Sequence, residues 1–317
     1  MNKTLVNLLA CFIPSRRKRR AFRNKMLNKV VSFEFLSERE LETVVAVQVQ
    51  NDYNFSRAKV AEKLVVFFEI APYRMCGGQM SLFSYCKYSK QILGDSVEVL
   101  MTTIPGKYTY SHNKHFENDI DICRWEQVRE LLKGKRECIL HIPEVDLVNP
   151  ENGEELVRTA LLGEDFELLR SIEHLHINIV NQQIELMPSP EKYRWLFSLT
   201  DNVTTTVCNR TSATQKACDE IGTPLHMLSV HYDLGNTKRV PPKKKEKLIL
   251  LSPDIPPEGL DYKIRFIQKL NQELPDYKIF VIRNLTLQDC MRLTAAAALV
   301  ITFGEGFDGY LNNSPQV

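Results

Sequence analysis

The sequence predicts an α/β protein made of two Rossmann-like domains, of which the second is incomplete. Short apolar runs rich in β-branched residues alternate with helical segments, a rhythm that predicts parallel sheets with helices on both faces. A stretch rich in proline and lysine at residues 235–246 lacks this rhythm and is typical of a linker between domains. The length of 317 residues suits two domains that each bury a core.

The first domain is predicted to occupy residues 34–234. Ser37 and Glu40 have the spacing of a capping box, which predicts a helix that starts there and runs toward Gln50. A second helix is expected from Gln79 to Leu93. Six strands are expected at residues 64–71, 97–104, 138–142, 176–180, 202–207 and 225–230.

The second domain is predicted to occupy residues 247–317, with strands at 247–252, 277–282 and 299–303 and helices at 260–274 and 285–297. The strand at 299–303 is almost continuously apolar, so we expect it to be central in its sheet. A complete domain of this type usually has more βα units than the three that follow the linker. We therefore expect one flank or face of this sheet to be uncovered and to favour self-association.

The charged residues divide the chain into a basic arm, residues 1–33, and an acidic body. Nine of the 41 Lys and Arg residues lie within residues 1–30, which contain no acid, so the other 32 accompany 39 Asp and Glu residues. A nucleic-acid-binding protein needs basic residues across its folded surface, so we expect no nucleic-acid partner. With 44% hydrophobic and 25% charged residues, the composition is that of a soluble globular protein.

The arm has the pattern of a helix that lies on a membrane surface. Apolar residues recur at helical spacing from Leu5 to Ile13, and Pro14 and a basic block follow. Such an order suits apolar side chains in lipid and basic ones on anionic headgroups. A signal peptide needs a longer apolar core, and the lipoprotein-like box ending at Cys11 has the basic block on the wrong side. A solvated basic tail is the simplest alternative. No segment reaches the roughly 18 apolar residues of a spanning helix.

Neither the cysteines nor the histidines predict a metal site. The eight cysteines occur singly, without a C-x-x-C pair, and we expect them to be reduced thiols in a cytoplasmic protein. No H-x-x-x-H occurs. Asp119 and Asp121 form a D-x-D sequence, but strand-like alternation and a following helix explain it. Four histidines lie in or beside apolar runs, and each is expected to be a satisfied core residue rather than a base, namely His141, His176, His226 and His231.

The most informative motif follows the last predicted strand. Residues 299–304 (LVITFG) have the pattern of a buried strand ending in glycine, and Glu305, Gly306 and Phe307 come directly after it. Open α/β sheets bind ligands at the carboxyl ends of their strands. Because a carboxylate accepts hydrogen bonds from hydroxyl groups, a sugar is a natural partner for Glu305. A glycine turn with a solvated acid is the alternative.

This motif resembles the donor site of GT-B glycosyltransferases, particularly bacterial enzymes that build lipopolysaccharide and capsule. Residues 70–81 (IAPYRMCGGQMS), 181–188 (NQQIELMP) and 12–17 (FIPSRR) resemble the same enzymes. The resemblance implies two domains with ligands in the cleft between them, and a hexosyltransferase-like activity. It further implies a nucleotide-sugar donor, a lipid-linked or cell-surface glycan acceptor, no metal cofactor, and a peripheral place at the cytoplasmic face of the membrane.

The resemblance also implies roles for individual residues. Gly304, Glu305, Gly306 and Phe307 would bind the donor, with Glu305 contacting the sugar. Gly77, Gly78 and Gln79 follow the first strand, where glycines permit a close backbone approach and a helix begins. They would line the cleft, although a tight turn explains them equally well.

Two further positions are weaker candidates. Ser252 and Asp254 follow the first strand of the second domain and could contact the phosphates or sugar of the donor, or cap a helix. His231, near the end of the last strand of the first domain, is a weak candidate for a catalytic base.

The chain departs from the family pattern near its end. Retaining GT-B enzymes often have a second Glu eight positions after the first, and this position is Asn313. With its second domain apparently truncated, we expect weak donor binding by this chain. The alternative is therefore a truncated, non-catalytic, membrane-associated interaction protein related to glycosyltransferases.

Overall fold

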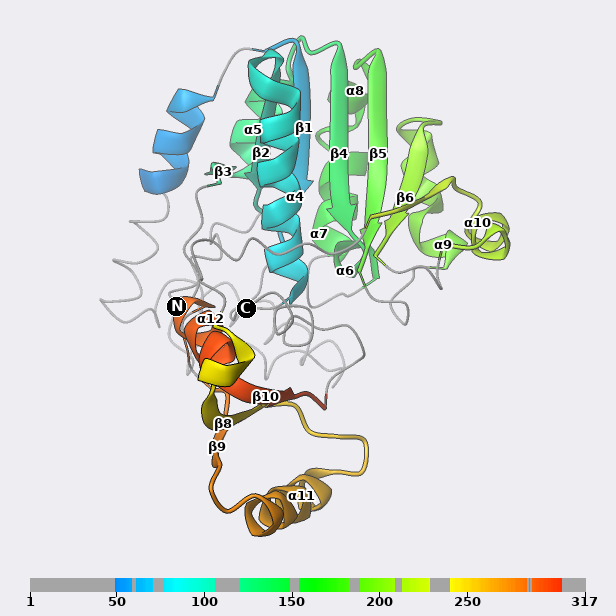
Figure 1. Ribbon diagram of the computed structural model, residues 1–317. Helices are drawn as coiled ribbons and strands as arrows, with labels where there is room; N and C mark the ends of the chain where they lie inside the picture. The colour runs from blue at the N-terminus through cyan, green and yellow to red at the C-terminus, as the bar shows by residue number, and fades with distance from the viewer. Residues whose placement is uncertain are drawn as a thin grey trace, which may run out of the picture. The chain divides into compact units, whose positions relative to one another are not determined.

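The computed structural model describes residues 49–58, 61–70, 77–105, 120–148, 154–182, 189–208, 213–228, 240–283, 285 and 287–303. The chain divides into two units, Met1–Gln50 and Asn51–Val317, and nearly all described residues belong to the second. Their strands form two sheets, whose elements are labelled in Figure 1. The predictions for the basic arm and for the capping box at Ser37 concern residues outside the described ones.

The first sheet has seven parallel strands in the order β3-β2-β1-β4-β5-β6-β7. Its strands are β1 Lys63–Phe68, β2 Val97–Thr102, β3 Ile122–Cys123, β4 Glu137–Pro143, β5 His174–Asn181, β6 Val203–Val207 and β7 Leu225–Met227. All six predicted strands are present. The short β3 is the addition, and two residues are too few to produce a recognisable sequence pattern.

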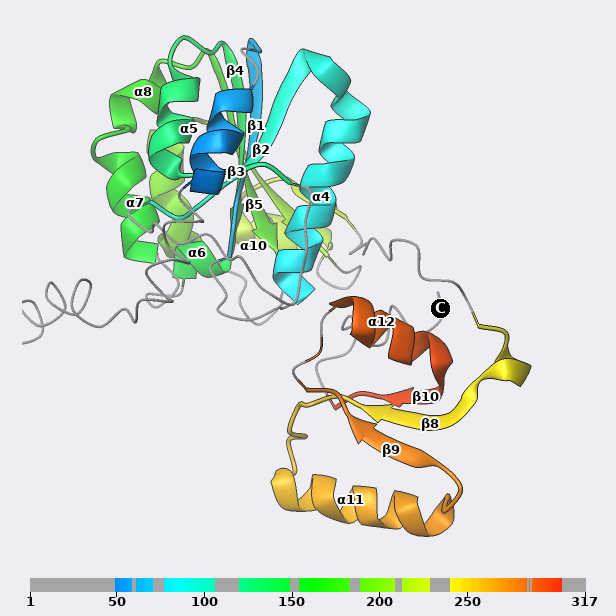
Figure 2. The same ribbon diagram turned by 90° about the vertical axis from the view of Figure 1, so that its left-hand side faces the viewer.

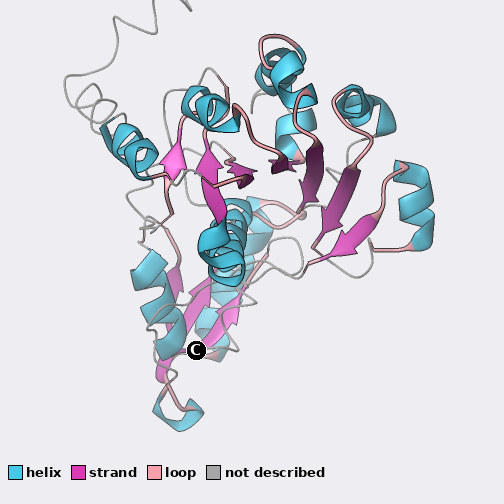
Figure 3. Cartoon of the chain, turned by 90° about the horizontal axis from the view of Figure 1, so that it is seen from above, coloured by secondary structure: helices cyan, strands magenta, loops and turns pink. Residues whose placement is uncertain are grey.

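Helices cover this sheet on both faces, as Figures 2 and 3 show. Helix α4 (Gly77–Leu93) packs on one face, where Val65 and Phe67 of β1 meet Leu82 and Phe83. The opposite face carries the larger core, to which Val66 and Phe68 belong. The remaining elements are η1 Gly94–Ser96, α5 Trp125–Leu132, α6 Val145–Val148, α7 Glu154–Leu162, α8 Phe166–Arg170, α9 Pro190–Tyr193, η3 Arg194–Ser198 and α10 Gln215–Ile221. Alternate residues of β1 thus enter different cores, as the pleat of a strand requires.

The helix at residues 49–57 is fixed to the edge of the first sheet. The side-chain amides of Asn51 and Asn54 both donate to the carbonyl oxygen of Ile122 in β3, at 2.8 and 3.0 Å. Arg124 pairs with Asp52 at 2.7 Å. The described helix ends at residue 57, seven residues beyond Gln50, toward which the sequence predicted a helix to run.

A polar row crosses the face of the first sheet that also carries α4. The register places Phe67, His141, Asn178 and Thr204 side by side on four neighbouring strands. Asn178 Nδ2 lies 3.0 Å from His141 Nδ1, and Thr204 donates to the Asn178 oxygen at 3.0 Å. His141 also stacks on Phe67 with ring centroids 4.2 Å apart. The predicted structural role of His141 is confirmed by these contacts.

The other two described histidines with this prediction, His176 and His226, differ in their burial. His176 is half-buried and its Nε2 lies 2.8 Å from the Thr204 hydroxyl, which supports the predicted structural role. His226 lies in the edge strand β7 and is exposed. The expectation of a core histidine is therefore wrong for His226, because a strand at the edge of a sheet has fewer packing neighbours.

The second sheet has three parallel strands in the order β10-β8-β9. Its elements are η4 Pro242–Lys244, β8 Glu246–Leu251, α11 Leu260–Glu273, β9 Lys278–Val281, α12 Leu287–Ala296 and β10 Ala297–Ile301. Figure 2 shows α11 and α12 on opposite faces of this sheet. The prediction of two parallel sheets with helices on both faces is thus confirmed.

The expected central position of the strand at 299–303 is wrong for the described sheet. The central strand is β8, which buries four consecutive residues, and β10 is at the edge. Val300 packs toward Leu248 and Leu250, whereas Leu299 on the other face is 45% exposed. The continuous apolar run of residues 299–303 suggested a strand buried on both faces. Of the three strands of this sheet, β8 is the one with that burial.

The network around His141 predicts a pH dependence of stability. Burial, with a smaller effect of the charge on His176, lowers the pKa of His141 to about 3. The pKa of a histidine in an unfolded chain is about 6.5. Below that pH the unfolded chain binds a proton at this position while the folded protein does not, so the free energy of unfolding falls as the pH falls. We expect His141→Gln to make the free energy of unfolding fall less steeply between pH 7 and pH 4, measured by urea denaturation. The matched control is His174→Gln, because His174 is the exposed first residue of β5. Equal slopes for wild type and His141→Gln would contradict the prediction.

Candidate functional site

The strand orders identify where each sheet is open to a ligand. In the first sheet the order reverses between β1 and β4. The chain after β1 enters α4 on one face, while the chain after β4 enters α6, whose Leu147 belongs to the core of the other face. In the second sheet the corresponding reversal lies between β8 and β10. Such reversals leave a crevice at the carboxyl ends of the strands.

At the carboxyl edge of the first sheet, two of the motifs identified in the sequence meet. Gln182, which follows β5, donates from Nε2 to the carbonyl oxygen of Gly78 at 3.0 Å. A Cβ atom on Gly78 would overlap Gln182 Oε1, so any larger residue would require the Gln182 carboxamide to shift. Gln79 is buried and accepts a hydrogen bond from the backbone amide of Ile70 at 2.9 Å. Gly77 is the first residue of α4.

Carboxyl and carboxamide groups gather at the same strand ends. Glu69 follows β1, Glu144 and Asp146 follow β4, and all three residues are buried. Asn181, the last residue of β5, is also buried, and its side-chain nitrogen has no hydrogen-bond partner among the described residues. These groups accept and donate hydrogen bonds, which suits a ligand rich in hydroxyl groups. Sequence reasoning missed the three acids, of which Glu69 lies within a predicted strand and Glu144 lies two residues after another, whereas Asn181 opens the segment 181–188 identified from the sequence.

Cys208, which follows β6 at this edge, lies in surroundings that disfavour its thiolate. Burial raises the pKa of the Cys208 thiol to about 11. The hydrogen bond with Tyr85 lowers this pKa, and the charge of Glu144 raises it further. The Tyr85 oxygen lies 3.7 Å from its sulfur. Because the thiolate is the reactive form, a thiol with this pKa is inert at neutral pH.

At the carboxyl edge of the second sheet, Ser252 joins the two strand ends. Its side-chain oxygen accepts a hydrogen bond from the amide of Phe303 at 3.1 Å, and its own amide donates to Ile301 at 2.9 Å. Ser252 is fully buried. The bonds hold the loop after β8 against the end of β10, immediately before the predicted Gly304–Glu305 motif.

A buried lysine holds the same loop from behind. Lys263, on α11, donates to the carbonyl oxygens of Ser252 and Asp254, at 2.6 Å each. Its ammonium also lies 5.1 Å from the centre of the Phe303 ring, which Phe266 meets edge-on. Sequence reasoning missed Lys263. The available signal was a lysine three residues from both Leu260 and Phe266, on the apolar side of a predicted amphipathic helix.

Several predicted site residues lie outside the described residues. These are Gly304, Glu305, Gly306, Phe307 and His231, and their roles remain predictions. Asp121 is described, and it forms an ion pair with Lys90 at 2.8 Å. That pairing favours the structural interpretation of the D-x-D sequence. No group of three or more potential metal ligands occurs among the described residues.

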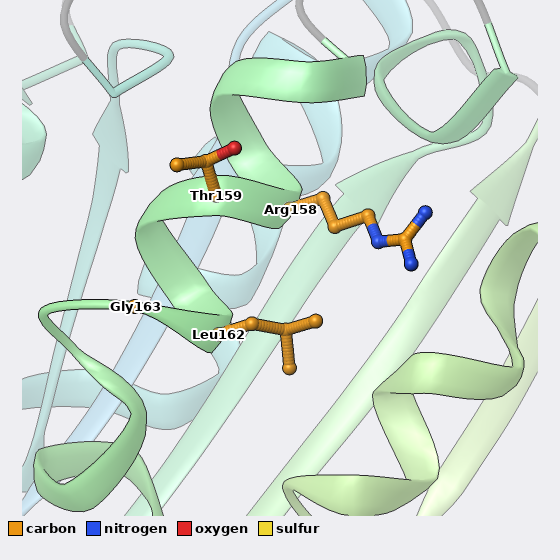
Figure 4. A pocket seen from close by; sticks show the side chains of 4 residues that line it. All are labelled: Arg158, Thr159, Leu162 and Gly163. Atoms are coloured by element: carbon orange, nitrogen blue, oxygen red, sulfur yellow. The ribbon is translucent and has the colours of Figure 1, made fainter.

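A shallow pocket on α7 is lined by Arg158, Thr159, Leu162 and Gly163. Figure 4 shows Arg158 and Leu162 extending from the same side of the helix. None of the residues predicted from the sequence lines this pocket, and it contributes a single charged side chain. We therefore place the candidate site at the strand ends.

Of the comparisons with known proteins, the search of solved structures gave matches. No protein-family model matches the chain, and no curated protein matches it. Among solved structures, an alpha-glucosyltransferase in complex with UDP and a 13-mer DNA containing an HMU base is similar, with a TM-score of 0.45 and 8% sequence identity. The match covers 76% of this chain and 66% of that one. A likeness at this level assigns neither substrate nor activity to the present chain.

One finding concerns membranes. Within the described ranges, no helix has the length and apolar character needed to cross a bilayer.

The contact between Gly78 and Gln182 is testable by a double-mutant cycle. Gly78→Ala should displace Gln182 and break its bond to the Gly78 carbonyl, lowering the free energy of unfolding by about 1 kcal/mol. In a Gln182→Ala background the same change should be neutral or stabilising, because Ala is preferred to Gly in a helix. Urea denaturation of the wild type, both single variants and the double variant gives the coupling. Additive effects would show that Gly78 is not required for the approach of Gln182.

Proposed function

We propose that the chain is a GT-B-type glycosyltransferase, which moves a sugar from a nucleotide-sugar donor to a glycan acceptor. The observation that carries the proposal is the joining of the β8 and β10 ends by Ser252. This bond places the loop of Ser252 and Asp254 beside the backbone that leads into Gly304 and Glu305. The Ser252 loop and Phe303, the residue before the predicted donor motif, therefore share one strand edge, where ligands of open α/β sheets bind.

Each predicted residue has a role in this proposal. The Glu305 carboxylate accepts hydrogen bonds from hydroxyl groups of the donor sugar, and Gly304, Gly306 and Phe307 shape its surroundings. Ser252 and Asp254 contribute the loop on the other side of the donor.

The first-sheet edge is proposed as the acceptor side. The first turn of α4, with Gly77, Gly78 and Gln79, is held by Gln182 at the same strand ends as buried carboxyl groups, which suit hydroxyl-rich ligands. His231 remains the proposed, weaker candidate for a base.

We propose that the reaction needs no metal cofactor. In a metal-independent transfer, the charge that develops on the leaving diphosphate is stabilised by oriented backbone amides and basic side chains. The acceptor in this proposal is lipid-linked or belongs to a cell-surface glycan such as lipopolysaccharide or capsule. A bacterial protein at the cytoplasmic face of the membrane, attached through residues 1–30, fits such an acceptor.

A second candidate function is that of a non-catalytic interaction protein on the same membrane. The observation in its favour is the position of β10 at the edge of the described second sheet, with Leu299 45% exposed. Exposed apolar strand edges pair readily with other chains. Turnover of a nucleotide sugar by the 317-residue chain would exclude this candidate as the sole function.

Glu305→Gln tests the donor site directly. If the carboxylate binds donor hydroxyls, losing a charged hydrogen bond of about 1.5–3 kcal/mol should weaken nucleotide-sugar binding roughly ten- to a hundredfold. The melting temperature should stay nearly constant. Calorimetry against a panel of nucleotide sugars measures the affinity, with Glu273→Gln on exposed α11 as the matched control. A fall in melting temperature with unaltered affinity would make Glu305 a structural residue.

Deletion of residues 1–25 tests the membrane proposal. The shortened protein should remain folded but no longer sediment with anionic vesicles, because it lacks most of the basic arm. Sedimentation of the full chain should also weaken as salt is added, since salt screens exposed charges. Neutral vesicles serve as the control, and equal sedimentation with and without the arm would refute this attachment.

A further inference from the structure

The polar row on the first sheet has a fixed direction of hydrogen bonding. Asn178 on β5 lies at its centre, and its Oδ1 accepts hydrogen bonds from the hydroxyl groups of Thr204 and Thr206 on β6, at 3.0 Å each. A carboxamide oxygen can only accept, and a carboxamide nitrogen can only donate. Asn178 therefore turns its oxygen toward β6 and its nitrogen toward His141 on β4, whose Nδ1 lies 3.0 Å away. Figure 1 shows these three strands side by side.

This direction determines where the protons of two histidines lie. Because Asn178 donates to His141 Nδ1, that nitrogen is bare and the proton of the neutral His141 ring is on Nε2. Thr204 uses its single hydroxyl proton on Asn178, so it accepts at its 2.8 Å contact with His176 Nε2. The His176 proton is therefore also on Nε2. At neutral pH the row has one consistent setting, in which both rings are Nε2–H tautomers.

The centre of the row is closed to water. Asn178 is 4% exposed, and Thr204 and Thr206 are 8% exposed each. Among the described residues, Asn178 is the one acceptor of the Thr206 hydroxyl group. A buried polar group that loses its partner is costly, because water does not replace the lost hydrogen bond. A change in the protonation of His141 must therefore be accommodated within the row itself.

We infer that the row is a proton-operated switch, in which protonation of His141 reverses the Asn178 carboxamide. A proton from solvent on His141 Nδ1 would face the Asn178 nitrogen, so two donors would meet at 3.0 Å. Turning the carboxamide over removes this conflict, because its oxygen then accepts from His141 and its nitrogen donates to Thr204 and Thr206. The Thr206 hydroxyl proton is left without its acceptor. The proton thus reverses every hydrogen bond that Asn178 makes and weakens the tie between β5 and β6.

The charged neighbours of His141 set the conditions under which the switch operates. Burial and the charge on His176 lower the pKa of His141 to about 3. Burial and, to a smaller extent, the charge on His226 lower the pKa of His176 in turn. On the side of β1, the neighbour of His141 is the uncharged Phe67 ring. The row therefore keeps its neutral setting near pH 7 and reverses in acid.

Nitrogen-15 NMR of the histidine rings in the full 317-residue chain reads the setting directly. At neutral pH, His141 and His176 should both be Nε2–H tautomers. Asn178→Asp leaves only acceptors at the centre of the row, so His141 should carry a proton on Nδ1. Its pKa should rise by about one to three pH units, because an opposite charge nearby favours the charged ring. The matched control is Asn202→Asp at an exposed position before β6, which should leave the His141 tautomer unchanged.

The wild-type protein decides if Asn178→Asp does not fold. As the pH falls, the backbone amide signals of Thr204 and Thr206 should move with the same midpoint as the His141 ring. The signal of Thr205, whose hydroxyl group lies on the other face of the sheet, is the control. A proton on His141 Nδ1 at neutral pH, or threonine signals that do not follow the titration of His141, would overturn the switch. An Nε2–H tautomer of His141 in Asn178→Asp would also overturn it. None of these readouts depends on sugar transfer, so they are independent of the proposed function.

Discussion

The reversal of strand order is the constraint on which both sheets depend. Parallel strands need crossover connections, and these are right-handed, so strands added on opposite sides of a first strand send their helices to opposite faces. The loops at the reversal consequently leave in opposite directions and do not cover the strand ends between them. Backbone groups there need other polar partners. Gln182 supplies one to Gly78 in the first sheet, and Ser252 supplies one to Phe303 in the second.

The two edges have the same architecture but opposite charge. Buried acids, namely Glu69, Glu144 and Asp146, lie at the first edge, whereas Lys263 and Arg283 lie at the second. Electrostatic complementarity selects ligands of different classes for such surfaces. Carboxylates suit neutral hydroxyl groups, and cations suit phosphates. Under the proposed function, the protein brings an anionic donor to a hydroxyl-bearing acceptor, and this reaction needs both kinds of surface.

The sequence was sufficient to predict most strands, but not which strands lie next to each other. Strands such as β4 and β5 were predictable because burial of successive residues leaves a local pattern of apolar side chains. The order of strands depends on contacts between distant residues, and so the edge position of β10 could not be read from its composition. The same reason explains the site. Gly78 was identifiable as a glycine before a helix, but its partner Gln182 lies 104 residues away. Lys263 was visible only as a lysine on an apolar helix face.

Two buried charged groups are compensated in different ways. Asp165 accepts a hydrogen bond from the Trp125 indole at 2.7 Å and pairs with Arg129 at 3.0 Å, so the fold itself compensates its charge. Such a group serves the packing of α5 and needs no ligand. Among the described residues, the hydrogen-bond partners of Lys263 are two backbone carbonyl oxygens, and its ammonium lies over the Phe303 ring. A methionine at this position would match the packing of α11 but would leave both carbonyl oxygens without this donor, which is costly for buried groups. The charge of Asp165 is therefore balanced by a charged partner, whereas that of Lys263 is used to hold the Ser252 loop against the end of β10.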